Sequence, residues 1–189
     1  MKELNWDALL HDERRKTRAE EGESTNTEKG RVQLERDYDR ILFATPTRRL
    51  ADKTQVFPLE KNDSVRTRLT HSHEVANLAR SIGVRIAFDH AEEVFGPEAD
   101  QWQVQRTVPA LLAAIGLSHD LGNPPFGHQG EEAIQAWFRE RHEEEDGALE
   151  GKIHPDFLNF DGNAQSFRLL ARLQTLNDDF GLNLTDATL

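Results

Sequence analysis

The sequence predicts a mostly α-helical fold. Two amphipathic stretches and the lack of strand patterns support this prediction. Residues 64–87 and 107–120 place apolar side chains at the three- and four-residue spacing of a helix. No convincing run of alternating apolar and polar residues indicates a β-sheet elsewhere. The residues that carry chemistry are therefore expected on helices and on the turns that join them.

The composition excludes several classes of protein. The chain has 189 residues and no cysteine, which rules out disulfides and thiolate metal sites. No apolar run approaches the roughly 20 residues that cross a bilayer, and the N-terminus has no signal-peptide core. We therefore expect a cytoplasmic protein with no membrane partner. The net charge of -11 argues against a generally basic nucleic-acid surface. An anionic substrate remains compatible, because a bound metal and a few arginines dominate the local field.

The chain begins with a charged segment. Residues 1–30 are polar, and their composition predicts a flexible N-terminal segment. Residues 31–189 are predicted to form one domain, or part of a larger one. This domain begins with a short helix within 32–50 that ends in a turn at Pro46.

The remaining connections are predicted from local composition. Residues 54–59 are expected to be extended, and three helical stretches follow them. The acidic run at 141–152 is expected to be a solvated loop. Helical or turn pieces are expected over 154–174.

One helix face selects a histidine in the first stretch. A single apolar stripe is formed by His71, Val75, Leu78, Ile82 and Ile86. His73 lies about 200° around the helix from this stripe. We therefore expect His71 to face the core and His73 to face away. A lone histidine on such a stripe is more often a core residue than a ligand, so a metal role requires a partner.

The second stretch supplies that partner. Thr107 is the expected N-cap, with Pro109 in the first turn. The inward stripe of this helix ends on His119, and Asp120 follows directly. A buried carboxylate requires a cation beside it. His71, His119 and Asp120 together predict a divalent metal site, either a transition metal or Mg²⁺ with additional waters.

A glycine- and proline-rich turn follows the aspartate. Gly122 is expected to adopt a positive φ, and the Pro124–Pro125 pair prevents the helix from continuing. A new helix is predicted to open near His128, with Glu131 on the same face. Two interpretations of this pair stay open. It is either an ordinary acidic helix start or a general acid with a carboxylate that orients it.

Three longer strings resemble a known family. They are "RRLADKTQVFPLEKNDSVRTRLTHSHEV", "HDLGNPPFGHQGEEAI" and "FDGNAQSFRLLARLQ". In this order they resemble the deoxyguanosinetriphosphate triphosphohydrolases of the metal-dependent HD phosphohydrolase superfamily. The resemblance extends from about Val32 to the last residues.

The resemblance implies a helical HD-domain fold and cleavage of a dNTP, with dGTP the expected substrate, to deoxynucleoside and tripolyphosphate. It also implies a homo-oligomer. Its expected metal ligands for Mn²⁺ or Mg²⁺ are His71, His119 and Asp120. Its expected catalytic pair is His128 and Glu131. The expected substrate contacts are Arg68 and Asn123 to phosphate and Gln55 to the sugar or base.

The sequence departs from this family in one respect. The family's fourth metal ligand, a later aspartate, is not found, and Asp178, Asp179 and Asp186 do not stand in its context. The chain is therefore expected to be an N-terminal portion, with an HD-domain fold incomplete at its C-terminus. Its metal site would be weak and its pocket open on one side. His154 is expected on a loop surface.

Two alternative functions remain. An HD domain could instead release one phosphate from a nucleotide or cut a cyclic dinucleotide. The chain could also be catalytically incomplete and act through oligomerisation or by binding nucleic acid. Arg48, Arg49 and Lys53 are the candidate basic residues for that surface, and single-stranded DNA is a candidate effector.

Overall fold

The structure is a computed structural model that describes residues 4–19, 30–53, 55, 62, 64–143, 154–173 and 179–189. Its helices are α1 (Trp6–Leu9), α2 (Arg15–Ala19), α3 (Gln33–Phe43), α4 (Thr45–Arg49), α5 (Arg68–Asp89), α6 (Ala91–Phe95), α7 (Val104–Ser118), α8 (His128–Glu143), α9 (Pro155–Leu158) and α10 (Gly162–Arg168), with a 3₁₀ turn at Leu50–Asp52 and a π-helical turn at Leu169–Leu173. Within these ranges no strand forms, and Arg14 and Thr185 make an isolated β-bridge. The predicted mostly α fold is confirmed.

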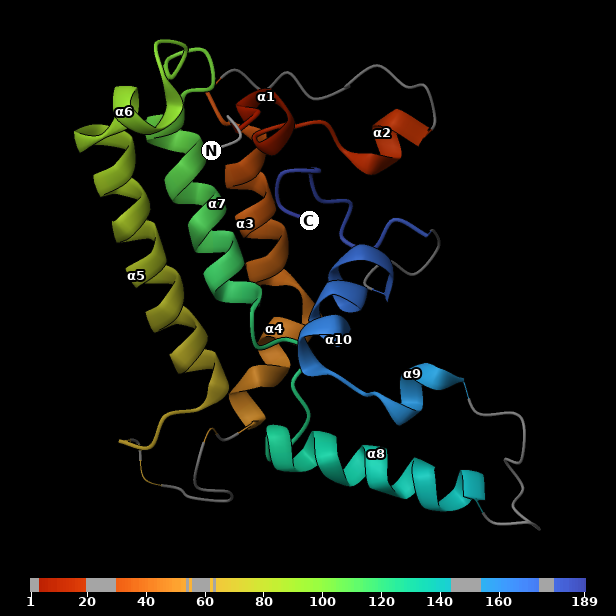
Figure 1. The fold of residues 1–189 in the computed structure, drawn as a ribbon. Coiled ribbons are helices and arrows are strands. Elements are labelled where there is room, and N and C mark those ends of the chain that lie inside the picture. The colour runs from red at the N-terminus through yellow and green to blue at the C-terminus, as the bar shows by residue number, and fades with distance from the viewer. Residues whose placement is uncertain are drawn as a thin grey trace.

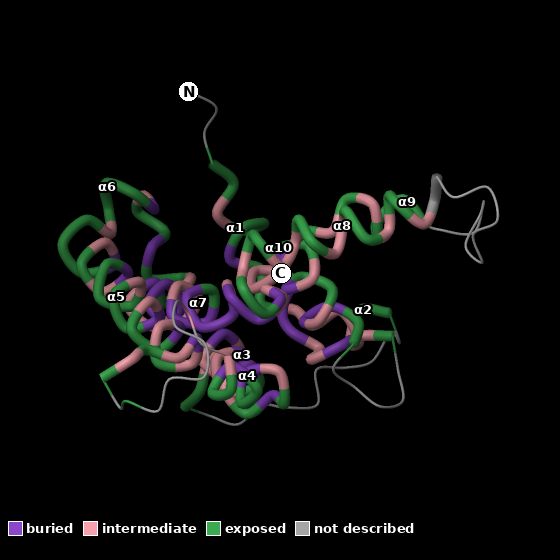
Figure 2. Tube along the Cα trace, turned by 90° about the horizontal axis from the view of Figure 1, so that it is seen from below, coloured by how far each residue is buried: buried purple, intermediate pink, exposed green. Residues whose placement is uncertain are grey.

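Helix α7 is the centre of the fold. It lies between α5 and α3, so that the three helices form one layer (Figure 1). Buried residues follow α7 along most of its length (Figure 2). The helix begins at Val104, earlier than predicted, and Thr107 is not its N-cap. The Thr107 hydroxyl instead donates to backbone carbonyls of the preceding turn, and Pro109 lies buried inside the helix.

Small residues bring α5 and α7 close together. A Cβ added to Gly116 of α7 would lie 2.8 Å from the Cα of Ala76 on α5. A Cβ added to Gly83 of α5 would lie 3.0 Å from the Cα of Pro109 on α7. Contacts this close leave no room for a larger side chain. The relative position of His71 and His119 therefore depends on these two glycines.

The stripe predicted to face the core from α5 is not the buried face. The residues buried on α5 are Arg68, Ser72, Ala76, Gly83 and Ala87. Leu78 and Ile82, from the predicted stripe, are 64% and 59% exposed, and Ile115 of α7 is 46% exposed. The predicted buried face of α5 was wrong for a physical reason. Residue spacing identifies the more apolar face of a helix, but the face that packs closely against α7 carries small side chains. His73 is exposed, as predicted.

Pro46 does not end the first predicted helix. Helix α3 ends at Phe43, and Ala44 is the N-cap of the next short helix. Pro46 lies in the first turn of α4, where its missing N–H costs no hydrogen bond. Helix α4 and the following 3₁₀ turn carry the chain toward α5, against which that turn packs.

Buried Asp37 of α3 joins the two ends of the described chain. Its carboxylate accepts a hydrogen bond from the Arg14 guanidinium at 2.7 Å. It also accepts from the backbone and hydroxyl of Thr185 and from the hydroxyl of Thr188. Residues 4–19 lie in the segment for which composition predicts flexibility, yet they are held to the core by these contacts.

Helix α8 lies apart from the central layer (Figure 1). It begins at His128, as predicted, and no residue from 128 to 141 is buried. Its outer half is held by α9, where the rings of Phe138 and Phe157 are 4.8 Å apart. The predicted extended piece at 54–59 and the predicted acidic loop at 141–152 fall almost wholly outside the described residues.

In the part of the chain that the structure describes, no helix is both long enough and apolar enough to traverse a lipid bilayer.

Candidate metal and catalytic site

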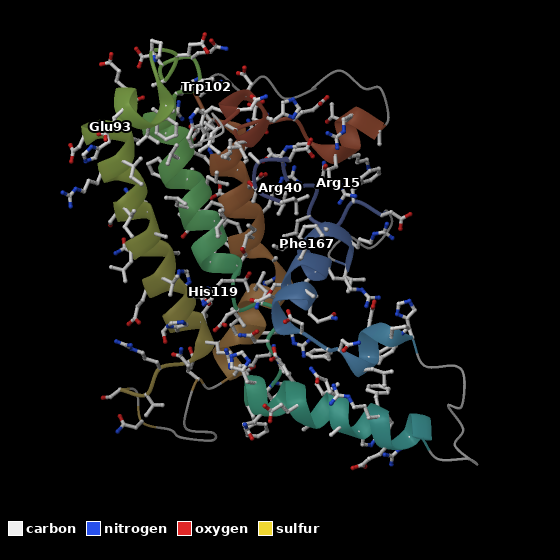
Figure 3. All side chains as sticks on the ribbon, viewed as in Figure 1. Arg15, Arg40, Glu93, Trp102, His119 and Phe167 are labelled. Carbon is white, nitrogen blue, oxygen red and sulfur yellow. The ribbon has the colours of Figure 1, made fainter. Side chains whose placement is uncertain are left out.

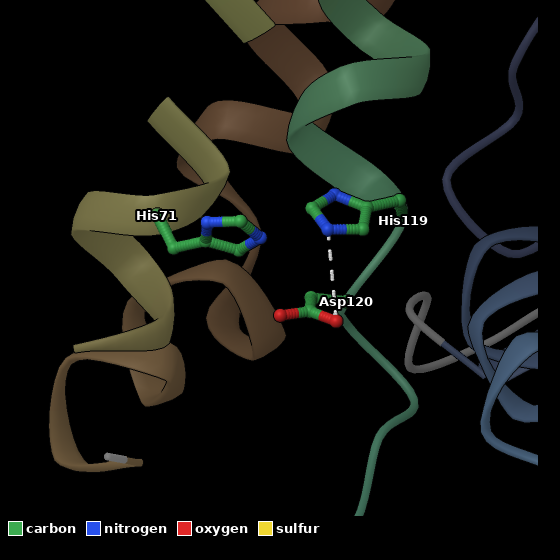
Figure 4. Close-up of side chains that lie close together, drawn as sticks. All are labelled: His71, His119 and Asp120. Atoms are coloured by element: carbon green, nitrogen blue, oxygen red, sulfur yellow. Dashed lines mark ion pairs between the residues drawn. The ribbon is translucent and has the colours of Figure 1, made fainter. Parts of the chain in front are cut away.

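Three of the predicted site residues converge where α7 ends beside the first turns of α5 (Figures 3 and 4). One ligand atom from each of His71, His119 and Asp120 lies within 4.8 Å of the others. The two imidazole rings meet edge to face, with centroids 5.3 Å apart. Both histidines are half-buried and Asp120 is buried. We call these three residues the metal triad.

Backbone contact orients the His119 ring. Its Nδ1 lies 2.8 Å from the carbonyl oxygen of Gly116, which only accepts hydrogen bonds. Nδ1 therefore carries the proton, and in the neutral ring Nε2 keeps its lone pair. That Nε2 lies 3.6 Å from Oδ1 of Asp120. Two acceptor atoms directed toward one point are favourable when a cation lies between them.

Asp120 has two further partners in the structure. Its Oδ2 accepts a hydrogen bond from Nη1 of Arg68 at 2.9 Å, and its Oδ1 accepts one from the side-chain amide of Asn123. Arg68 and Asp120 each expose 8% of their side chains. The cation that sequence reasoning required beside Asp120 is thus present as Arg68. The side-chain amide of Asn123 donates to the Asp120 carboxylate, and its predicted contact with a phosphate stays a prediction.

The donor set fits a divalent metal ion. Imidazole nitrogen and carboxylate oxygen suit Mn²⁺ and other first-row metals, and Mg²⁺ binds such a carboxylate together with several waters. The fixed His119 tautomer is the arrangement usual for a metal-ligating histidine. His71, His119 and Asp120 are therefore the residues that would hold the ion.

The second predicted pair, His128 and Glu131, is formed at the start of α8. Nδ1 of His128 lies 2.8 Å from Oε2 of Glu131. The His128 side chain is 91% exposed, whereas that of Glu131 is 14% exposed. The other Glu131 oxygen accepts a hydrogen bond from the backbone N–H of Gly162 at 2.8 Å. Glu131 is thus fixed by α10 and presents His128 to the solvent side of the site.

Glu131 also changes the acidity of His128. Its hydrogen bond and its negative charge raise the pKa of His128 above the ordinary value, while the nearby charge of Arg68 lowers it. A histidine with a raised pKa keeps its proton at higher pH, which suits a general acid.

In the turn between the metal triad and α8, the glycines have other roles than predicted. Gly122 does not adopt a positive φ; Phe126 and Gly127 do. Gly122 is required for close approach, because a Cβ there would lie 2.1 Å from the backbone nitrogen of Ser166. Gly127 lies against Arg68, whose Nη2 would be 3.1 Å from an added Cβ. Arg68 therefore reaches from Asp120 toward the residue that precedes His128.

Two supporting residues were not identified from the sequence. Gly162 lies against both parts of the site: a Cβ there would lie 2.1 Å from Oδ1 of Asn123 and 2.7 Å from Oε1 of Glu131. Lys53, considered only for a nucleic-acid surface, donates to the backbone oxygen of Asn123 at 3.0 Å. Burial lowers the pKa of Lys53, and the charges of Arg49 and Arg68 lower it further. The string "FDGNAQSFRLLARLQ", one of the three that carry the family resemblance, contains Gly162 and was the available signal.

Two cavities adjoin these elements. A pocket of about 290 Å³ lies beside the Asn123 turn and includes Arg49, Lys53, Asn123 and Phe160 in its lining. A groove of about 820 Å³ lies between α3, α5 and α7, and no predicted site residue lines it.

The remaining sequence candidates are Gln55, Asp178, Asp186 and His154. Gln55 is half-buried. Asp186 pairs with Arg18 and His11 at the N-terminal end, consistent with its rejection as a ligand. His154 is exposed and caps α9, as expected for a surface residue. Asp178 is outside the described residues.

Comparison with known proteins finds relatives whose names match the family that the resemblance suggested. The chain is 45% identical over 195 aligned residues to a deoxyguanosinetriphosphate triphosphohydrolase-like protein of Listeria monocytogenes, an alignment that covers 98% of this chain and 41% of that protein. A protein of the same name from Pseudomonas aeruginosa is 40% identical, with 98% and 40% covered. One from Synechocystis is 45% identical, with 84% and 36% covered. The chain thus spans about two fifths of the length of these relatives.

A family model described as the HD domain matches residues 68–176. This range holds the whole metal triad, the His128–Glu131 pair and Gly162. It also covers more than half of the chain, and the chain therefore belongs to the HD domain family.

Proposed function

We propose that this chain carries the metal-binding and catalytic residues of a dNTP triphosphohydrolase. The reaction would cleave a dNTP, with dGTP the expected substrate, to deoxynucleoside and tripolyphosphate. The observation that carries the proposal is the convergence of the ligand atoms of His71, His119 and Asp120 within 4.8 Å, beside the buried guanidinium of Arg68. The names of the relatives support the substrate class.

The chain's residues have distinct roles in this proposal. The metal triad holds Mn²⁺ or Mg²⁺, which when bound supplies the positive charge that polarises the α-phosphoryl group. Arg68 offers a planar fork of donors to phosphate oxygens. Gln55 is proposed near the sugar or base. Asn123 is proposed to serve phosphate binding chiefly by keeping Asp120 in place.

His128 is proposed to be the general acid. In its protonated form it transfers a proton to the 5′ oxygen of the leaving deoxynucleoside. Glu131 orients the ring through the 2.8 Å contact with Nδ1 and leaves Nε2 to face substrate. Because Glu131 raises the pKa of His128, the acid form is more populated at a given pH than in an ordinary histidine.

The biological setting is proposed on the same basis. We propose a cytoplasmic homo-oligomer, with single-stranded DNA as a candidate effector. These proposals concern a protein of the relatives' full length, which is more than twice the length of this chain.

The test is chromatography of dGTP incubated with the purified chain and Mn²⁺, beside the Asp120→Ala variant. Equal amounts of deoxyguanosine and tripolyphosphate, absent with the variant, are the expected result. Orthophosphate as the product would favour a nucleotide phosphatase instead, and cleavage of a cyclic dinucleotide alone would favour a phosphodiesterase. Mn²⁺ binding without turnover of any of these substrates would favour a catalytically incomplete chain.

A further inference from the structure

Arg68 is the counter-ion of Asp120, the carboxylate of the metal triad. Its Nη1 donates to Oδ2 of Asp120 at 2.9 Å, and both side chains are almost wholly buried. Asp120 is the carboxylate through which the triad would hold a metal ion. A guanidinium and a divalent cation that share one buried carboxylate repel each other. Each cation therefore weakens the binding of the other to this residue.

The hydrogen bonds of Arg68 are incomplete in this position. Its Nε is buried and has no hydrogen-bond partner in the part of the chain that the structure describes. The second oxygen of Asp120 accepts a hydrogen bond from Asn123, and among the described residues the guanidinium donates to this carboxylate at Oδ2 alone. A ligand with several acceptor oxygens, such as a phosphate group, would satisfy more of the five N–H donors.

The opposite edge of the guanidinium points toward the second half of the site. Its Nη2 lies against Gly127, directly before His128. Arg68 is also close enough to lower the pKa of His128. A small movement away from Asp120 would thus bring the guanidinium to the space between the metal triad and the proposed general acid.

We propose that Arg68 and the divalent metal ion compete for Asp120. In the metal-free protein Arg68 neutralises the buried carboxylate, and metal binding releases the guanidinium for phosphate. Metal binding and phosphate binding are then coupled through one side chain. The proposal rests on the proposed function of the metal triad.

The test compares Mn²⁺ affinity in three proteins, measured from the loss of the electron paramagnetic resonance signal of free Mn²⁺. Arg68→Gln should bind Mn²⁺ about tenfold more tightly than the wild type, because a charge-assisted bond no longer competes. A merely structural role would give weaker binding in this variant. Unchanged or weaker binding in a folded Arg68→Gln protein overturns the proposal.

Arg66→Gln is the matched control. It also removes one positive charge, two positions from Arg68, but Arg66 is exposed and pairs with Glu74 and not with Asp120. Its Mn²⁺ affinity should change less than about twofold, since exposed charges contribute little. An equal gain in Arg66→Gln and Arg68→Gln would mean general electrostatics, and the competition would be refuted.

A second measurement does not depend on the folding of Arg68→Gln. The guanidinium ¹⁵N signals of wild-type Arg68, assigned with Arg68→Lys, should shift as diamagnetic Zn²⁺ saturates the site. Signals that stay unchanged at saturation would show that Arg68 does not leave Asp120, which contradicts the proposal.

Failure of the proposed site itself has a separate signature. His71→Ala and Asp120→Ala should each abolish the Mn²⁺ binding seen in the wild type. If both variants bind Mn²⁺ like the wild type, the metal triad is not the metal site, whatever Arg68→Gln does. If both lose binding and Arg68→Gln gains none, the triad stands and the competition fails.

Discussion

At the scale of single residues, the candidate site depends on the groups that hold the proposed metal ligands and the proposed general acid as much as on those side chains. Gly116 supplies the carbonyl that sets the His119 tautomer. Asn123 and Arg68 take the two oxygens of Asp120. Glu131, itself held by the Gly162 backbone, orients His128. The contacts of Arg68 with Asp120 and of Gly162 with Glu131 join separate elements, which residue spacing alone does not reveal.

The first prediction at this scale concerns the titration of His128. Because Glu131 raises its pKa, Glu131→Gln should lower that pKa toward the ordinary value, and the alkaline limb of the activity profile should move to lower pH. The sign for stability follows from linkage: protonated His128 stabilises the fold fully below its unfolded pKa, and this contribution disappears as pH rises through its folded pKa. The measurement is an NMR titration of the His128 ring protons.

The control for this titration is Glu132→Gln. Glu132 is exposed and raises the pKa of His128 through charge alone, less than Glu131 does. A shift in Glu132→Gln as large as that in Glu131→Gln would contradict the role assigned to the hydrogen bond.

The second residue-scale prediction concerns Gly162. In Gly162→Ala the new Cβ would overlap Oδ1 of Asn123 and crowd Oε1 of Glu131. We expect a loss of about 1–3 kcal/mol in the free energy of unfolding, typical of overpacking, together with a lowered pKa of His128. Urea denaturation and the NMR titration measure these effects. Asn163→Ala, at the exposed neighbouring position of α10, should change neither, and equal losses in both would exclude the steric explanation.

At the scale of elements, α5 and α7 meet through glycine and alanine, and this choice positions the metal triad. The close contact of Gly116 with Ala76 places the start of α5 beside the end of α7. The larger apolar residues of α5 are thereby moved to its flank. An apolar stripe at helical spacing therefore predicted the helix correctly but predicted its buried face incorrectly.

The prediction at this scale contrasts two substitutions on α5. Leu78→Gln should change the free energy of unfolding of this chain by no more than about 0.5 kcal/mol, because Leu78 is 64% exposed. Ala76→Leu should cost about 1–3 kcal/mol and weaken Mn²⁺ binding, since the added atoms would meet Gly116. Urea denaturation and Mn²⁺ titration measure both. The opposite order would mean that the stripe of Leu78 and Ile82 is the buried face.

At the scale of the whole molecule, the described ends of the chain meet on α3. Asp37 is fully buried and accepts hydrogen bonds from Arg14 near the N-terminus and from Thr185 and Thr188 near the last residue. This carboxylate connects segments more than 140 residues apart in sequence. Asp37 should therefore contribute to the stability of both residues 4–19 and residues 179–189.

The prediction at this scale is a large loss of stability in Asp37→Ala. Removal of this carboxylate leaves Arg14 without its ion-pair partner and the buried backbone N–H and hydroxyl of Thr185 without this acceptor, at a cost of about 3–5 kcal/mol. Asp39→Ala, which removes an exposed pair with Arg31, should cost less than about 1 kcal/mol. The midpoints of urea denaturation of Asp37→Ala and Asp39→Ala, each compared with the wild type, measure these two losses. Similar losses would show that Asp37 does not hold the ends together.

The sequence by itself determined the helical fold class, the start of α8 and the residues of the metal triad. Periodicity and residue chemistry are local properties, and His71, His119 and Asp120 could be chosen from them. The Arg68 contact with Asp120, the support from Gly162, the buried face of α5 and the link at Asp37 were decided by the tertiary structure. These features join residues more than 20 positions apart, or depend on the distance between two helices, and neither is encoded in a local pattern.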